Sequence, residues 1–91
     1  MSYGNLALMH NGKLPLKGRQ ASSYLIIHVP TKTRVVGPLR GHKYAIEIVE
    51  RLLGVDDWEF NEVDSLDPQR AMKMLGELRR VEEEEASRCR T

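Results

Sequence analysis

The fold is decided by the stretch YLIIHVPTKTRVVGPLRGHKYAIEIVERLL, which occupies residues 24–53. Its first six residues, Tyr24–Val29, alternate two sets of side chains with the period of two that a strand requires. Both sets are largely apolar, which favours a central strand over an edge strand. Pro30 ends this strand, and Arg34–Val36 is predicted to return as a second strand that Gly37–Pro38 would break.

A helix is predicted next, over His42–Leu53, because its apolar residues recur at helical spacing while charged residues cover the other side. Gly54 stands where a left-handed C-terminal cap is favoured. In the segment Asp57–Val63, Trp58 and Phe60 fall on one face and polar residues on the other. That alternation predicts a half-buried strand.

A second helix is predicted to open at Asp67–Pro68. The Asp67 side chain can accept a hydrogen bond from the first free amides, and proline has the backbone angle that the first helical position needs. An apolar stripe follows at helical spacing, made of Ala71, Met74, Leu75, Leu78 and Val81. The four glutamates at 82–85 lie near the helix C-terminus, where the helix dipole opposes them. We therefore expect the helix to fray after about residue 85.

The N-terminal segment is the least regular part of the sequence. Asn11–Gly12 is a strong signal for a two-residue hairpin turn, because both residues tolerate positive φ. Glycines at positions 4, 12 and 18 are equally compatible with a mobile arm. Residues 1–23 are therefore expected to form a weak hairpin or an arm, residues 24–85 a single domain, and residues 86–91 a frayed tail.

Together these elements predict an α+β domain. We expect a small antiparallel or mixed sheet, in the order hairpin, helix, strand, helix, with two helices packed on one face. The core is predicted to consist of Leu25, Ile27, Val29, Val35, Ala45, Val49, Leu52, Trp58, Phe60, Leu75 and Leu78. So small a core favours self-association through the second helix or the strand Arg34–Val36, and a homodimer is the expected state.

Length and composition bound the class of protein. The chain has 91 residues, of which 41% are hydrophobic and 30% are charged, and this predicts one ordinary globular domain. The longest apolar run, Tyr24–Ile27, is far shorter than a membrane-spanning helix needs, and Met1–His10 lacks the pattern of a secretory signal. The single cysteine, Cys89, cannot form an internal disulfide and suggests a reducing, cytoplasmic setting.

Charge is distributed unevenly along the chain, although the formal net charge is only +1. Residues 1–46 contain seven basic side chains and no acid, so they carry +7. Residues 47–91 contain the other seven basic side chains and all thirteen acids, so they carry −6. This asymmetry is typical of a surface for nucleic acid or an acidic partner, and two halves that dock onto each other would show it equally.

The residue types that enzymes use are scattered. His10, His28 and His42 lie far apart, with no cysteine or acid at a metal-ligand spacing, and His28 is predicted to be a structural strand residue. Cys89 has no activating neighbour in the sequence. The carboxylates gather in the second predicted helix, where they are typical of a solvated face. We therefore expect no catalysis, no metal and no cofactor.

The segment Gly37–Lys43 joins a strand to a helix and is the strongest candidate for a binding site. Free amides at a helix N-terminus favour anions, and Arg40, His42 and Lys43 add positive charge there. The spacing of its glycines differs from that of a nucleotide-binding P-loop and of a KH-type loop. An anion contact and an ordinary connection both remain open. The full set of candidates for an anion or partner contact is Arg40, His42, Lys43, Lys32 and Arg34.

Two resemblances bear on function. Residues 34–53, RVVGPLRGHKYAIEIVERLL, are similar to the V-G-P stretch and following helix of sporulation-related peptidoglycan-binding repeats. The strand–helix unit that precedes this stretch in that family is missing, so the likeness indicates only a shared way of entering a helix. Taken whole, the chain resembles small accessory proteins of bacteriophages in its size, α+β pattern and Asp/Arg/Val/Glu-rich usage, with an actinobacterial host left open. That resemblance implies a protein that acts in the host cytoplasm by binding, and some such proteins inhibit host growth.

Two functions follow from these observations. The first is a non-catalytic effector that binds a host protein, and the second is a nucleic-acid-binding accessory protein that uses the basic residues 1–46. Trp58 and Phe60 stand among acids, which disfavours base stacking and leaves phosphate contact as the nucleic-acid route. The sequence therefore favours the protein-binding function, and no membrane contact is expected.

Overall fold

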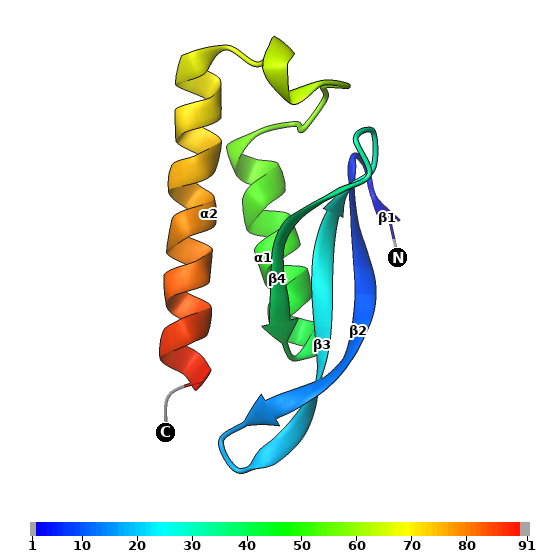
Figure 1. Cartoon of the computed structure of the whole chain (residues 1–91), viewed down its shortest axis with the longest axis vertical. Coiled ribbons are helices and arrows are strands. Elements are labelled where there is room, and N and C mark those ends of the chain that lie inside the picture. The colour runs from blue at the N-terminus through cyan, green and yellow to red at the C-terminus, as the bar shows by residue number, and fades with distance from the viewer. Residues whose placement is uncertain (1, 90–91) are drawn as a thin grey trace.

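The computed structural model describes residues 2–89 of the chain. Its elements are β1 (Ser2–Tyr3), β2 (Leu6–Leu16), β3 (Arg19–His28), β4 (Thr33–Arg40), α1 (His42–Val55), a 3₁₀ turn (Val63–Ser65) and α2 (Pro68–Cys89). Within residues 2–89 the strands form one antiparallel sheet in the order β1-β2-β3-β4. α1 covers one face of this sheet, and α2 packs against α1 and β4 (Figure 1). The chain is thus the α+β domain that its sequence predicts.

The central strand is β3, as predicted, because it pairs with β2 on one side and with β4 on the other. The prediction that Leu25, Ile27 and Val29 form the inner face of this strand is wrong. Ile26 and His28 point into the core with at most 1% of their surface exposed, whereas Val29, just after the strand, is 45% exposed. A strand that is apolar on both sides gives no signal of which face is covered. His28 belongs to the set that points inward, and a histidine there made that set look like the exposed one.

The core lies between the sheet and the two helices. It consists of Leu6, Leu8, Ile26, Val36, Leu39, Ala45, Ile48, Val49, Leu52, Trp58, Met74 and Val81. Four predicted members are therefore confirmed, namely Ala45, Val49, Leu52 and Trp58. Val35, Phe60 and Leu78 are partly buried against the core, but Leu75 is 54% exposed. Helical spacing predicted the burial of Met74 and Val81 in α2 correctly, but it did not show that Leu75 of the same stripe lies beyond the sheet.

The hairpin of β2 and β3 turns at Lys17–Gly18 and not at Asn11–Gly12, where the sequence predicts a hairpin turn. Lys17 and Gly18 have φ values of 49° and 83°, the two positive values that a two-residue hairpin turn requires. Asn11–Gly12 instead forms a β-bulge in β2 opposite Ser23, whose hydroxyl donates to the Gly12 carbonyl oxygen at 3.0 Å. Residues 6–23 thus lie in one long hairpin, which β2 and β3 form around the turn at Lys17–Gly18.

The last strand, β4, continues through Gly37–Pro38 to Arg40, although the sequence predicts a break there. The dipeptide forms a bulge opposite Leu25, and edge strands and bulges are the places where a sheet tolerates proline. Gly37 has a φ of 133°, and a Cβ at this position would lie 2.9 Å from the carbonyl oxygen of Tyr24. This close approach is the reason that glycine is needed here.

The strand predicted over Asp57–Val63 is absent, and this segment is part of the connection between the helices. Asp56 and Asp57 accept hydrogen bonds from the backbone amides two residues further on, at 2.8 and 2.9 Å. Such turns occupy amides that a strand would use for pairing. Trp58 has a φ of 59°, outside the strand region, yet it is only 2% exposed, and Phe60 also packs against the core. The predicted burial is therefore confirmed although the predicted strand is wrong.

Both helices lie where the sequence predicts them, with different ends. α1 runs past Gly54, which is helical and is not its cap. α2 begins at Pro68, and the Asp67 carbonyl accepts the first helical hydrogen bond at 2.9 Å. The helix stays regular to Cys89, beyond the point where fraying is expected, because Glu85 is buried and ion-paired. Residues 90 and 91 of the predicted tail lie outside the described residues.

Candidate functional site

Arg40, the first candidate for an anion contact, is bound within the protein. Its backbone amide and its guanidinium Nη1 both donate to Oε2 of Glu85, at 3.0 and 3.2 Å. Glu85 is only 7% exposed, although it ends the run of glutamates that the sequence places on a solvated face. The charge of Arg40 is thereby compensated inside the chain, and an external anion at this position would have to compete with Glu85.

Arg88 completes an arrangement that we call the Glu85 cluster, which consists of Arg40, Glu85, Arg88 and Cys89. Arg88 Nη1 donates to the second oxygen of Glu85, and Nη2 donates to the Arg40 carbonyl oxygen at 3.0 Å. The Arg88 guanidinium also lies 3.6 Å from the centre of the Tyr44 ring. The cluster therefore joins β4, α1 and α2. Burial, and secondarily the Glu85 carboxylate, raise the pKa of the Cys89 thiol, which disfavours the nucleophilic thiolate.

The other basic candidates lie at two separate places. His42 and Lys43 are exposed in the first turn of α1, which contains no acid, and Gly41 precedes them with a φ of 97°. Lys32 and Arg34 are exposed at the opposite end of β4, roughly 20 Å away for a strand of this length. The sequence candidates thus divide between the two ends of β4 and do not form a single site.

His28 is a buried structural residue, as the sequence predicts. Its Nε2 carries a proton, because it lies 2.8 Å from the carbonyl oxygen of Trp58, which can only accept. In the neutral ring Nδ1 accepts from the Thr31 hydroxyl at 2.7 Å. The ring also stacks on Phe60, with 4.0 Å between the ring centres. His28 therefore joins β3 to the connection between the helices.

An ion pair holds the connection against α2. Arg70 donates to both carboxylate oxygens of Asp56, at 2.7 and 2.6 Å, and reaches Asp57 at 2.8 Å. The hydrogen bonds from Arg70 are the main reason that the pKa of Asp56 is lowered to about 2, although burial opposes the shift. Trp58 is fixed in turn, because its Nε1 donates to the Leu52 carbonyl oxygen at 2.9 Å. The connection is therefore a defined wall beside the first turns of α2.

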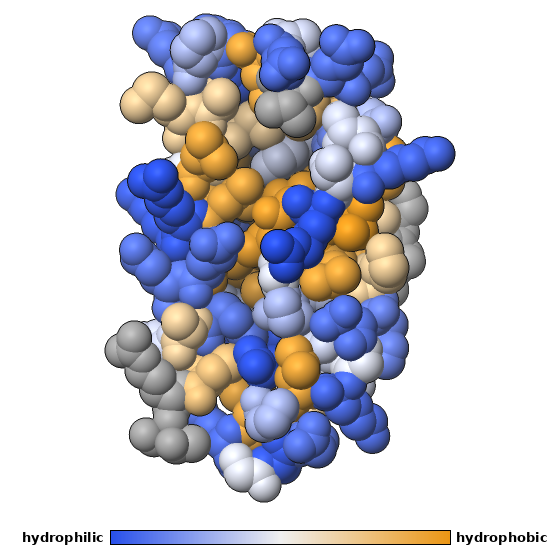
Figure 2. All heavy atoms as spheres, viewed as in Figure 1, coloured by the Kyte–Doolittle hydropathy of each residue, from blue (hydrophilic) through white to orange (hydrophobic). Residues whose placement is uncertain are grey.

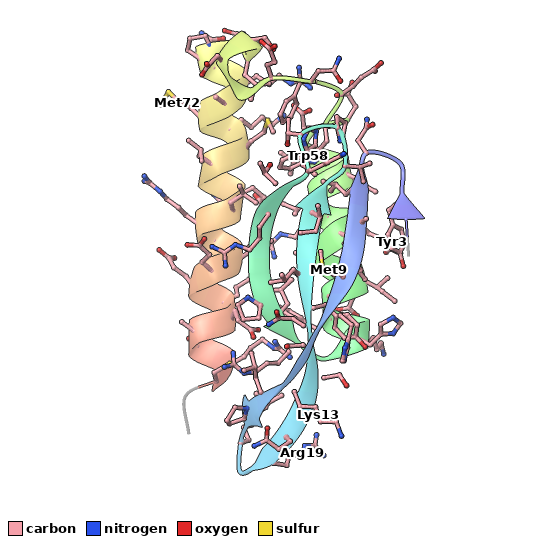
Figure 3. The ribbon with its side chains drawn as sticks, turned by 45° about the vertical axis from the view of Figure 1, so that its right-hand side comes forward. Tyr3, Met9, Lys13, Arg19, Trp58 and Met72 are labelled. Carbon is pink, nitrogen blue, oxygen red and sulfur yellow. The ribbon has the colours of Figure 1, made fainter. Side chains whose placement is uncertain are left out.

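An apolar groove opens between this wall, β4 and the first half of α2. It has a volume of about 290 Å³ and is lined by His28, Thr33, Arg34, Val35, Trp58, Phe60, Leu66, Ala71, Met74, Leu75 and Leu78. Figure 2 shows hydrophobic side chains along this part of the molecule. Met72 is 73% exposed on the same helix but is not a lining residue, and it points away from the sheet (Figure 3). The groove is therefore a feature of one side of α2 only.

The groove borders an edge strand. Within residues 2–89, β4 has a strand neighbour on one side only, which is β3. The C-terminal end of β4, at Arg40, is held to α2 by the Glu85 cluster, whereas its N-terminal residues, Thr33–Val35, lie beside the groove. An edge strand beside an apolar channel is the kind of surface to which an extended peptide adds.

Comparison of the chain with protein-family models, with curated proteins and with solved structures gave no match. In the described part of the chain, no group of three or more His, Cys, Asp or Glu residues is placed to hold a metal ion. No helix among these residues is long and apolar enough to cross a membrane. The groove and the distribution of charge are the features of the molecule that bear on its function.

The groove is not evident from the sequence. Val35, Leu75 and Leu78 are expected in the core, because apolar residues at strand or helical spacing give the same signal whether or not another element covers them. A signal was present in α2, where Leu75 widens the apolar stripe beyond the residues that pack on the sheet. Only the position of the connection shows that a channel remains there.

Proposed function

We propose that this protein is a non-catalytic binding domain that holds an extended segment of a partner protein in the groove between β4 and α2. The observation that supports this most is the groove itself, an apolar channel of about 290 Å³ beside an edge strand. An extended segment can add to such an edge through backbone hydrogen bonds while alternate side chains enter the channel. Val35 and Leu75 would contact those side chains from the two walls.

Basic side chains at the groove favour an acidic residue in the proposed bound segment. Arg34 lines the groove, and its Nη1 donates to the Gly37 carbonyl oxygen at 3.0 Å, which holds the guanidinium along β4. Lys32 stands exposed just before this strand. A segment with apolar residues at alternate positions and a nearby acid would therefore fit best. In this way Arg34 and Lys32 serve as partner contacts, one of the two roles that the sequence leaves open for them.

The resemblance of the whole chain to phage accessory proteins supports a host cytoplasmic protein as the partner. Occupation of a functional surface on that protein would slow host growth. Growth should then fall when the wild-type chain is expressed in bacterial cells, and Leu75→Glu should relieve the effect at equal protein level. Equal growth defects with both chains would argue against the groove as the cause.

The direct test is selection from a library of random peptides displayed against the immobilised protein. We expect enriched peptides to carry apolar residues at alternate positions and to bind with micromolar dissociation constants. Leu75→Glu, inside the groove, should weaken binding of a selected peptide at least tenfold. Met72→Glu is the matched control, because it places the same charge on the same helix outside the groove. Backbone amide signals of Thr33–Val35 should shift on binding.

Two results would overturn the proposal. One is the absence of any enriched peptide from a library of adequate size. The other is equal loss of binding in Leu75→Glu and Met72→Glu, which would place the peptide elsewhere. Circular dichroism of both variants establishes that they remain folded, and Leu75 is exposed enough for a charge to be tolerated.

A nucleic-acid function is favoured by one specific observation. β3 pairs with β4 only as far as Ser23, so residues 13–22 form a ribbon of two strands alone at one end of the molecule (Figure 1). This ribbon and its turn carry Lys13, Lys17 and Arg19, all exposed, and no acid. Lys13 and Arg19 are labelled in Figure 3. A two-stranded ribbon fits the major groove of DNA. The same basic residues could therefore contact phosphates.

Fluorescence anisotropy with a mixed-sequence DNA duplex tests this second function. Binding should weaken with salt, and replacing Lys13, Lys17 and Arg19 with alanine should reduce the salt slope by about three. The matched control replaces Lys73, Arg79 and Arg80 of α2, which removes equal charge from another surface. Absence of binding at low salt, or an equal effect of both triple variants, would reject the nucleic-acid function.

A further inference from the structure

The side of the sheet that faces away from α1 is apolar over β2 and β3, and Arg34 of β4, which pairs with Ile27, borders this apolar area. Met9 pairs with Leu25 and Ala7 pairs with Ile27 across β2 and β3, so these four residues share one face. Met9 is 50% exposed, and Val29, just after β3, is 45% exposed. We call Ala7, Met9, Leu25, Ile27 and Val29 the outer sheet face. Figure 2 shows hydrophobic side chains over the middle of the sheet, with one hydrophilic side chain across them and further hydrophilic side chains around them.

We infer that a second copy of this chain covers the outer sheet face. An apolar area of this kind on a small domain marks a contact surface. Two sheets pack face to face with their inner side chains interdigitated, and a two-fold axis makes one face complementary to itself. The contact differs from the two that the sequence favours for a homodimer, α2 and the edge of β4.

Charge at the two ends of the molecule decides the orientation of the copies. The ribbon with Lys13, Lys17 and Arg19 lies at one end of the long axis, which is 42 Å in extent, and the connection between the helices lies at the other (Figure 1). Residues 56–67 contain six acids and no base. Arg70 pairs with two of these acids, and the remaining four, Glu59, Glu62, Asp64 and Asp67, are exposed.

An antiparallel arrangement follows from these charges. If the two-fold axis is perpendicular to the long axes, the basic ribbon of each copy comes to the same end as the acidic connection of the other. If the axis is parallel to them, like charges meet, which costs free energy. Opposite charges therefore select the antiparallel dimer. In that dimer the acidic connection and a nucleic acid would compete for the same three basic side chains.

Light scattering or sedimentation equilibrium over a concentration series tests the contact. The wild-type chain should reach twice its monomer mass in the micromolar range, and Met9→Lys should raise the dissociation constant at least tenfold. Met72→Lys is the control: it makes the same change at a residue that is more exposed, at 73%, but lies on α2. If Met9→Lys does not fold, Val29→Lys replaces it, at a position just after β3.

A spin label tests the orientation. A nitroxide on Lys17→Cys, in a Cys89→Ser background, is mixed with an isotope-labelled copy that carries no spin label. We expect broadening of amide signals in residues 56–67 of the isotope-labelled copy, which lie at the far end of the molecule from residue 17 in any one chain. Three results would overturn the inference: a monomer at all concentrations, equal dimerisation of Met9→Lys and wild type, or broadening confined to residues 13–22. None of them bears on peptide binding in the groove.

Discussion

The contact between β4 and α2 is closed at one end and open at the other. At the closed end the Glu85 cluster fastens Arg40 to the last turns of α2 through buried charged hydrogen bonds. At the open end the same two elements diverge around an apolar groove, and Leu75 remains 54% exposed. The strongest basic candidate of the sequence thus stabilises the fold, whereas residues assigned to the core form the candidate site. The proposed binding site therefore rests on uncovered apolar surface and not on positive charge.

The largest effect is expected at the closed end. Glu85→Ala should lower the free energy of unfolding by about 2–4 kcal/mol, because it leaves the charges of Arg40 and Arg88 partly buried without their partner. Urea denaturation measures this loss. Glu83→Ala, two residues away and exposed, should change stability by no more than about 0.5 kcal/mol. Similar effects of the two substitutions would show that the Glu85 cluster does not hold the closed end.

A pair of leucines compares the core with the open end. Leu52→Ala removes a side chain with no exposed surface and should cost about 2–4 kcal/mol through the cavity that it leaves. Leu75→Ala makes the same change in the groove, where water already reaches the side chain, and should cost less than about 1 kcal/mol. Thermal unfolding of both variants checks the difference. A large loss for Leu75→Ala would mean that the groove is closed in solution.

Element types were largely predictable from the sequence, because hydrophobic spacing and caps are local signals. The helix starts at His42 and Pro68 and the central position of β3 are correct for this reason. The strand expected at Asp57–Val63 is wrong because two aspartates capture backbone amides, a competition that alternation does not reveal. The turn at Lys17–Gly18 was missed because Asn11–Gly12 gives the stronger local signal, and the bulge that it forms depends on Ser23 across the sheet.

The candidate site was harder to predict than the fold. Arg40 has the appearance of an anion ligand in the sequence because its partner, Glu85, is 45 residues away. The groove depends on where the connection between the helices lies, and this is set by Asp56, Arg70 and the buried Trp58. Such contacts join residues that are distant in the sequence, so periodicity carries no information on them.

The smallest effect is expected at the open end, in the ion pair that positions the wall of the groove. Because the pKa of Asp56 is lowered from 3.8 to about 2, the folded state resists protonation more strongly than the unfolded state. This contribution to stability is complete above about pH 4 and is lost as the pH falls toward 2. Since Arg70 is partly exposed, we expect it to amount to about 1–2 kcal/mol.

Urea denaturation between pH 5 and pH 2 should therefore show that the free energy of unfolding of the wild type falls with acid. The fall should be about 1–2 kcal/mol smaller in Asp56→Asn, which lacks the titrating carboxyl. Asp64→Asn, at an exposed position of the same connection, is the control and should follow the wild-type curve. Parallel curves for wild type and Asp56→Asn would show that the ion pair contributes nothing in solution. If the loss is found, the binding of a selected peptide should weaken over the same pH interval, because the wall of the groove depends on this ion pair.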